Sequence, residues 1–266
     1  MLDAPKFEND VKIWLFNKAR NYMQRSDVIS VKTFLWIEDQ KDKAAYTFWK
    51  SMMQRLYPEV VVESKTNNSE LVKAVQKLSD WQNKYIIVFD NSFDNLQAIM
   101  EQRRLREAVA TRANVILFDI ICFEYILLEF RNLIDWIYAP NDEFLEKRHQ
   151  AVLAREKLLY CVTSGTADYK TLNEIVAYDE RVAEHNIEKL SAKLLFDLTR
   201  NTGFEVTKGS LGECWLLSCC EWTKREDNDI CGLDYRRLSI YDKMKSVYEN
   251  TCLQKQFQIA GLEIAL

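Results

Sequence analysis

Hydrophobic residues change their spacing several times along the first half of the chain. Short runs rich in β-branched and aromatic residues alternate with longer stretches that are apolar at every third or fourth position. The short runs predict buried strands, and the longer stretches predict helices with one apolar face. Strands are expected at residues 31–37, 60–62, 86–89 and 115–118, and helices at 43–56, 70–82 and 96–111.

This alternation of strand and helix is typical of a doubly wound α/β fold with a parallel sheet. The central run, residues 84–90 (KYIIVFD), is apolar without alternation, as expected for a strand buried on both faces. Right-handed crossovers bring the carboxyl ends of parallel strands to one edge of the sheet. We therefore expect Glu38 and Asp90, each following a predicted strand, to become neighbours.

Outside this region the pattern is mainly helical. Helices are predicted at residues 7–24, 123–138, 143–159 and 180–199. Residues 160–163 read as a short edge strand or an extended linker. The capping-box form T-x-x-E at 171–174 predicts the start of a further helix. In the α/β region, Ser69 is the expected cap of the helix at 70–82. The predicted organisation is an N-terminal helix (1–30), an α/β domain (31–138) and a mainly helical C-terminal lobe (139–266).

Composition narrows the class of protein. The 266 residues include only 6 Gly and 3 Pro, which disfavours a turn-rich all-β fold. A formal net charge of -4 argues against a uniformly basic nucleic-acid coat, although it allows a local basic groove. The most apolar long segment, 115–138, is interrupted by charged residues, so we expect no membrane association. An odd count of 7 Cys favours reduced thiols and a cytoplasmic location.

Acidic residues follow three of the predicted strands. The strand ends read WIEDQKDK, FDNSFDN and FDIICFE, and they place Glu38, Asp90 and Asp94 near the same sheet edge. Carboxylates in such a cluster repel one another unless they bind something, and Mg²⁺ or Mn²⁺ prefers oxygen ligands. A divalent ion there would assist hydrolysis of a phosphodiester, with Glu38 acting as the base. Spacing alone leaves open that these acids are turn and helix-cap residues.

The three segments together resemble the Toprim pattern over residues 31–130. They are most similar to Toprim-like nucleases of the overcoming-lysogenization-defect group and to the effector of PARIS-type phage-defence systems, which read E-G-x-x-D-K-x-x-Y, D-x-D-F-D and a segment like I-E-N-Y-L-L. The resemblance implies a divalent-metal-dependent nuclease acting on DNA or RNA, an anti-phage role and a regulatory ATPase partner. It implies catalytic roles for Glu38, Asp90 and Asp94, and metal ligation by Glu38, Asp42, Asp90, Asp94 and Glu124.

Two positions depart from that pattern. Asp39 stands where the family has glycine, and Ser92 stands where it has the middle aspartate. These departures favour an alternative from another class, a catalytically degenerate Toprim-like module that binds nucleic acid or a partner protein. A primase or topoisomerase domain ranks last, because the context of a catalytic tyrosine is missing.

Basic residues offer phosphate contacts near the predicted site. Lys41 and Lys43 follow the first strand, and Arg103 and Arg104 lie on the helix after the central strand. Such clusters are also typical of a solvated helix face. Neither interpretation of these basic residues indicates whether the substrate is DNA or RNA. The sequence also leaves the oligomeric state open.

A second candidate is the cysteine group at 214–231. Thiolates of Cys214, Cys219, Cys220 and Cys231 suit a structural Zn²⁺ site, because zinc takes four such ligands tetrahedrally. The spacing is not that of a zinc ribbon or knuckle. Packing as small, reduced core residues is the alternative reading.

Overall fold

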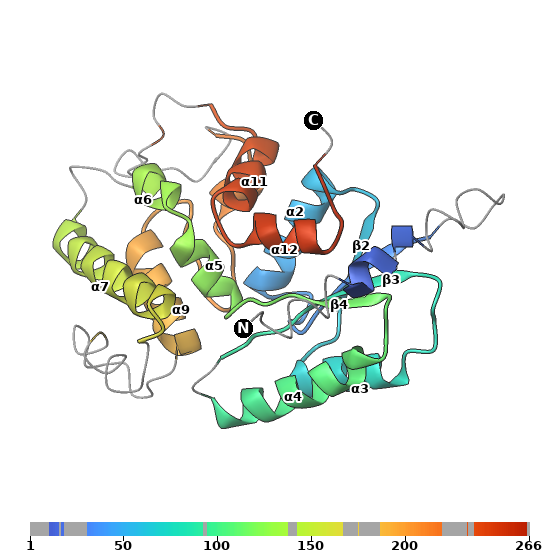
Figure 1. Cartoon of the computed structure of the whole chain (residues 1–266). Coiled ribbons are helices and arrows are strands. Elements are labelled where there is room, and N and C mark those ends of the chain that lie inside the picture. The colour runs from blue at the N-terminus through green and yellow to red at the C-terminus, as the bar shows by residue number, and fades with distance from the viewer. Residues whose placement is uncertain are drawn as a thin grey trace.

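Four parallel strands form the centre of the computed structural model, which describes residues 11–15, 17–18, 31–92, 95–137, 143–166, 175, 187–219, 233 and 237–264 (Figure 1). The strands are β1 (Thr33–Ile37), β2 (Val60–Ser64), β3 (Lys84–Val88) and β4 (Val115–Leu117), in the order β2-β1-β3-β4. Ile37 pairs with Ser64 on one side and Val88 on the other. The three longest strands therefore end at the same edge.

Helices cover both faces of this sheet because its strands are apolar on both sides. Leu35, Ile37 and Ile86 pack toward α2 (Ala44–Leu56), whereas Trp36 and Ile87 pack in a second core cluster. That second cluster includes α3 (Asn68–Lys77) and α4 (Leu96–Ala110), which lie side by side below the sheet in Figure 1. The predicted α/β class with a parallel sheet flanked by helices is confirmed.

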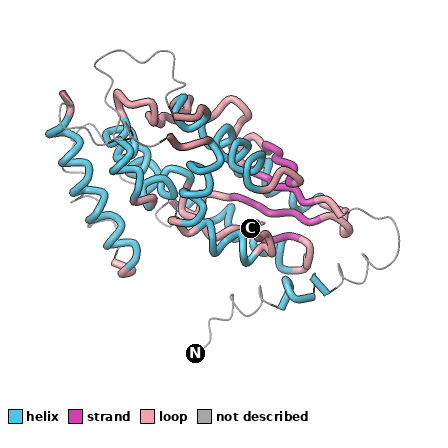
Figure 2. Tube along the Cα trace, turned by 90° about the horizontal axis from the view of Figure 1, so that it is seen from above, coloured by secondary structure: helices cyan, strands magenta, loops and turns pink. Residues whose placement is uncertain are grey.

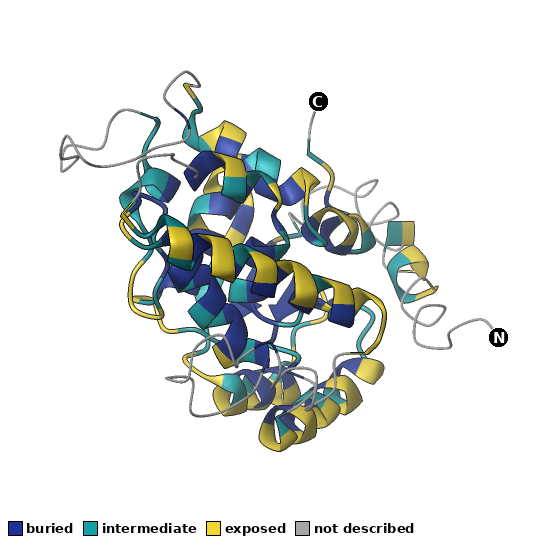
Figure 3. Ribbon diagram, turned by 90° about the vertical axis from the view of Figure 1, so that its left-hand side faces the viewer, coloured by how far each residue is buried: buried dark blue, intermediate teal, exposed yellow. Residues whose placement is uncertain are grey.

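The C-terminal half is a helical layer on the α2 side of the sheet (Figure 1). Figure 2 shows the strands gathered in one part of the molecule with helices packed beside them. Its aromatic residues continue the core of the α/β part: Trp215 lies 5.9 Å from Phe48 and 5.1 Å from Phe204, measured between ring centroids. Figure 3 shows buried inner faces and exposed outer faces on these helices. They are α5 (Phe123–Glu129), α6 (Asn132–Ile137), α7 (Leu145–Thr163), α9 (Ile187–Thr199), α10 (Glu213–Leu216), α11 (Ile240–Glu249) and α12 (Leu253–Ile259).

One helix prediction and one strand-or-linker prediction in this half are wrong. A single helix was predicted over residues 123–138, but the described residues 123–137 form two helices, because the Arg155 side chain donates to the carbonyls of Leu128 (2.5 Å) and Glu129 (3.4 Å) at the end of α5. Residues 160–163 are neither strand nor linker. They form the last turn of α7, where Cys161 is buried against the core.

The start of α3 also differs from expectation. Its cap is Asn67 rather than Ser69, because the Asn67 side chain accepts a hydrogen bond from Glu70 N at 2.9 Å. Part of the predicted N-terminal helix, residues 11–15 and 17–18, is helical, and the capping box at 171–174 lies outside the described residues. No helix in the described ranges is long and apolar enough to cross a membrane.

Candidate functional site

A pocket with a volume of about 510 Å³ opens at the carboxyl ends of β1 and β3. The chain passes from β1 through α2 to β2 on one side, then through α3 to β3 on the other side of β1. Crevices form at such a reversal of strand order, because the connections leave the two central strand ends in opposite directions. The volume lies in the range of small-molecule sites.

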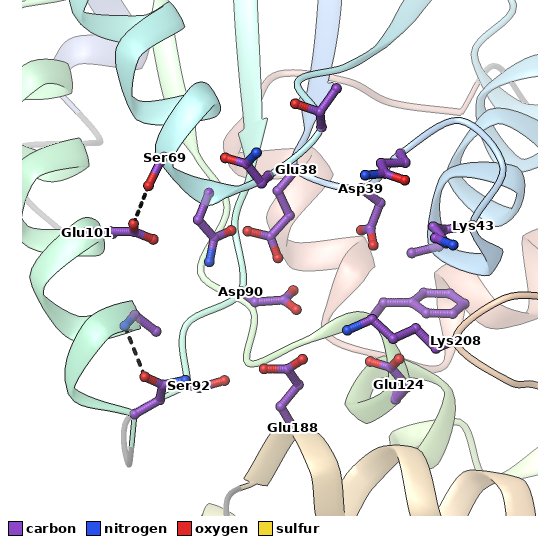
Figure 4. Close-up of a pocket in the computed structure, with 18 of the residues that line it drawn as sticks. Glu38, Asp39, Lys43, Ser69, Asp90, Ser92, Glu101, Glu124, Glu188 and Lys208 are labelled. Carbon is purple, nitrogen blue, oxygen red and sulfur yellow. Dashed lines mark hydrogen bonds between the residues drawn. The ribbon is translucent and has the colours of Figure 1, made fainter.

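Six carboxylates line this pocket, and four of them come from four different elements. Glu38 follows β1 directly, and Asp90 follows β3 by two residues. Glu124 lies in the first turn of α5 and Glu188 in the first turn of α9. Figure 4 shows the four side chains turned toward a common centre. Parallel strands and their following helices thus deliver acids that are far apart in sequence.

Backbone contacts fix the two strand ends that carry Glu38 and Asp90. Asp90 forms a parallel bridge with Ile120, and Asn91 N donates to Ile120 O at 3.2 Å. On the β1 side, the Ser64 hydroxyl donates to Asp39 O at 2.5 Å. The carboxylates therefore extend from anchored backbone and not from free loops.

Removal from water dominates the electrostatics of the cluster. Desolvation, reinforced by the charge of Asp39, raises the pKa of Glu38 to about 8, although contacts with Asp90 oppose the shift. Desolvation also raises the pKa of Glu124 to about 7 and that of Asp39 to about 6. Asp90 has its pKa raised well above the usual range by desolvation and by Glu38. Neutralisation, by protons or by a cation, is therefore favoured here.

Two lysines balance part of this charge. Lys208 lowers the pKa of both Asp39 and Glu124, against the larger effect of desolvation. Lys43 is the N-cap residue of α2, which has no side-chain cap and no acid in its first turn. Lys43, Ala44 and Lys208 all line the pocket, so positive charge and a helix N-terminus border its acidic part.

The other side of the pocket is made of amides and hydroxyls. Asn67 and Asn95 cap α3 and α4, while the Ser69 hydroxyl donates to Glu101 at 2.6 Å. Ser92 is 1% exposed, and its hydroxyl has no hydrogen-bond partner among the described residues. Figure 4 places Ser69, Glu101 and Ser92 on one side, opposite Asp39, Lys43 and Lys208.

Sequence reasoning located part of this site. Of the residues assigned to the site from sequence, Glu38, Asp90, Glu124 and Lys43 line the pocket, and Asp94 lies outside the described residues. Four other predicted residues do not line it. Asp42 is 71% exposed and lies 3.4 Å from Lys43. Lys41, Arg103 and Arg104 are exposed, with Arg103 paired to Glu107 at 3.2 Å.

Several residues of the site were not predicted. Glu188 and Lys208 come from the helical lobe, and Asn67, Asn68 and Ser69 from the start of α3. The amide and hydroxyl residues could have been predicted from sequence, because helices that follow parallel strands begin at the same sheet edge as the acids. No sequence pattern connects Glu188 or Lys208 to β1, since only packing of the lobe brings them there.

The zinc prediction stays a prediction. Cys214 and Cys219 are partly buried, and Cys220 and Cys231 lie outside the described residues. Within the part of the chain that the structure describes, no group of three or more His, Cys, Asp or Glu side chains is arranged to hold a metal ion. Comparison with protein-family models, curated proteins and solved structures finds no match to this chain.

Proposed function

We propose that this pocket is the active site of a divalent-metal-dependent nuclease that hydrolyses phosphodiesters of DNA or RNA. The observation that carries the proposal is the convergence of Glu38, Asp90, Glu124 and Glu188 in one pocket at the switch point of a parallel sheet. Structural acids at strand ends would point to solvent or to a basic partner. These acids instead face one another, and the pKa values of Glu38, Asp90 and Glu124 are raised.

The donor set suits Mg²⁺ or Mn²⁺. Glu38 Oε2 is buried and has no hydrogen-bond partner among the described residues, so it is available as a ligand or as a base. Mg²⁺ binds through one or two carboxylates and keeps water and phosphate oxygens as its other ligands, so a preformed group of three protein ligands is not required. Glu38 and Asp90 would hold the ion, and when bound it would neutralise phosphate charge and acidify water.

The chain's own residues have separate tasks in this proposal. Glu38 accepts the proton of the attacking water through Oε2, which has no hydrogen-bond partner among the described residues. Lys43 and Lys208 attract the phosphate oxygens. The apolar core under β1 and β3 holds the strand ends in place and keeps bulk water from one side of the reaction.

The experiment compares Glu38→Gln with Glu63→Gln on single-stranded DNA and RNA in the presence of Mg²⁺ or Mn²⁺. Glu63 lies on β2 near the same edge, does not line the pocket and pairs with Lys65 at 2.8 Å. We expect Glu38→Gln to reduce cleavage about 10²- to 10⁴-fold, the range for losing a general base, and Glu63→Gln to cleave like wild type. Full cleavage by the purified Glu38→Gln protein would refute the assignment.

The second candidate function is a module that binds nucleic acid or a partner protein without cutting. It is favoured by Ser92, which puts a hydroxyl where the resembling nucleases have a carboxylate, and by the absence of a preformed metal-binding group in the described ranges. Titration with Mg²⁺ separates the two. A metal site at about ten times its dissociation constant raises the unfolding free energy by about 1.4 kcal/mol, whereas a module without metal gains nothing.

The biological role is proposed on the resemblance alone. An anti-phage effector restrained by a regulatory ATPase partner, acting in the cytoplasm, is consistent with a nuclease that must be held inactive until infection. Co-purification with an ATPase encoded beside this chain, and release of nuclease activity when that partner is removed, is the expected result.

A further inference from the structure

The pocket has two chemically different sides, and the proposed function uses only one of them. The acidic side holds Glu38, Asp90, Glu124 and Glu188. The neutral side, which we call the amide side, is lined by side chains of α3, α4 and the loop after β3 (Figure 4). Its members are Thr66, Asn67, Asn68, Ser69, Ser92, Asn95 and Gln97.

Most polar groups on the amide side already have partners within the protein. Asn67 Oδ1 accepts from Glu70 N at 2.9 Å, and Asn95 Oδ1 accepts from Gln97 N and Ala98 N at 3.1 and 3.2 Å. Ser69 donates to Glu101. These bonds hold the helix starts in place and leave those side chains with little capacity for a ligand.

Two groups differ from the rest. Ser92 Oγ and Asn68 Oδ1 are buried and have no hydrogen-bond partner among the described residues. Ser92 is 1% exposed, yet it lines the pocket together with Asn68. Buried polar atoms in proteins are nearly always hydrogen-bonded, so a pair of orphans in one pocket indicates a ligand that completes them.

The chemistry of the two groups restricts that ligand. A serine hydroxyl both donates and accepts, whereas the Asn68 oxygen only accepts and needs a donor. Phosphate at neutral pH offers acceptors alone, and the carboxylate of Glu101 on this side disfavours an anion. A hydroxyl group carries both a donor and an acceptor, so it matches the needs of each residue. A hydroxyl can bond to the Asn68 amide in either of its two orientations, by donating to the oxygen or by accepting from the nitrogen. A phosphate can only accept, so it fits one orientation of the amide.

We infer that Ser92 and Asn68 form a subsite for a ribose hydroxyl of the nucleotide whose phosphate lies at the acidic side. This inference rests on the proposed nuclease function and names its substrate as a single-stranded RNA segment. The 2′-hydroxyl is the donor and acceptor that distinguishes RNA from DNA. The riboses of a flexible single strand are free to turn a hydroxyl into a pocket of about 510 Å³.

The test measures binding apart from cleavage. Fluorescence anisotropy of short fluorescein-labelled single-stranded RNA and DNA, matched in each of two base sequences, is followed with the Glu38→Gln protein in Mg²⁺. We expect RNA to bind about tenfold or more tightly than DNA, because a site built to bond a hydroxyl rejects the analogue that lacks it. Adding Ser92→Ala or Asn68→Ala lowers RNA affinity about fivefold and leaves DNA affinity within about twofold.

Asn91→Ala is the matched control. Asn91 adjoins Ser92 in sequence, donates to Asp119 at 3.2 Å and does not line the pocket, so its loss leaves both affinities unchanged. Thermal unfolding of each variant verifies that it is folded. If Ser92→Ala is unstable, the RNA and DNA affinities of Asn68→Ala test the subsite.

The outcomes separate this inference from the nuclease proposal. Equal affinity for RNA and DNA, or equal losses on both in Ser92→Ala, overturns the ribose subsite. A preference for base sequence that Ser92→Ala abolishes assigns these residues to a base edge and also overturns it. RNA preference without cleavage by wild type supports the subsite and refutes the nuclease, whereas Glu38-dependent cleavage without RNA preference does the reverse.

Discussion

The buried lysines and arginines of this molecule differ from the partly buried carboxylates of the pocket in whether the protein itself supplies their hydrogen-bond partners. The buried lysines and arginines among the described residues, Lys84, Arg148, Arg155 and Lys243, each donate to carbonyls at the end of a helix. Among the carboxylates of the pocket, Glu38 Oε2 is buried and has no hydrogen-bond partner in the described ranges. The cations are completed by the fold, whereas the acids need something that the fold does not supply.

The positions of the cations explain why they are structural. Arg155 ends α5, Arg148 contacts Leu198 O and Arg200 O at the end of α9, and Lys243 reaches Leu217 O at 2.6 Å beyond α10. Lys84 donates to Ala260 O after α12. Helix C-termini carry unpaired carbonyls and partial negative charge, which a buried cation satisfies. Chemistry with an outside ligand is accordingly expected at the acids and not at these cations.

The largest expected effect on stability comes from breaking a completed site. Replacing Arg155 by Met leaves the carbonyls of Leu128 and Glu129 without their donor in a buried environment. We expect a loss of about 3 kcal/mol in the free energy of unfolding, measured by urea denaturation. In the same assay, Glu38→Gln is expected to be neutral or stabilising at pH 8, because it removes an unpaired charge. If Glu38→Gln were destabilised as much as Arg155→Met, the proposed difference between the buried cations and the acids of the pocket would be wrong.

A smaller effect concerns pH. Because the folded-state pKa of Glu38 is raised from 4.5 to about 8, the native protein binds more protons than the unfolded chain between these values. Without divalent ions, stability should be greatest below about pH 4.5 for this group and fall as the pH rises toward 8, by up to about 1.4 kcal/mol per pH unit for each proton. Glu38→Gln should flatten the profile of melting temperature against pH. An identical slope in wild type and variant would contradict the raised pKa.

The smallest effects are expected outside the pocket. Asp42→Asn and Arg103→Ala alter exposed ion pairs at 3.4 and 3.2 Å. Each should change the unfolding free energy by less than about 1 kcal/mol, the usual limit for surface pairs. Cleavage rates should stay within about twofold of wild type, because neither side chain lines the pocket. A large loss of activity in Asp42→Asn would instead support the predicted role of Asp42 as a metal ligand.

The parallel sheet and part of the site followed from local pattern. Each predicted strand from β1 to β4 was found, because runs such as residues 84–88 have no polar side to expose and must lie inside an α/β sandwich. Glu38 and Asp90 followed from the same pattern, since parallel strands end at a common edge. The ends of helices were less predictable. α5 stops at Glu129 because of Arg155, a residue 26 positions away from it in sequence.

Sequence by itself determined which residues form the strands and which acids lie at their carboxyl ends, because hydrophobic periodicity and chain chirality are local constraints. Only the tertiary structure decided which acids share the pocket. Asp42 lies four residues after Glu38 and yet faces solvent, whereas Glu188 reaches the site from α9. The physical reason is that the burial of a charge depends on what packs over it. Packing of the helical lobe against α2 and the sheet is set by side chains distant in sequence, including Phe48 and Trp215.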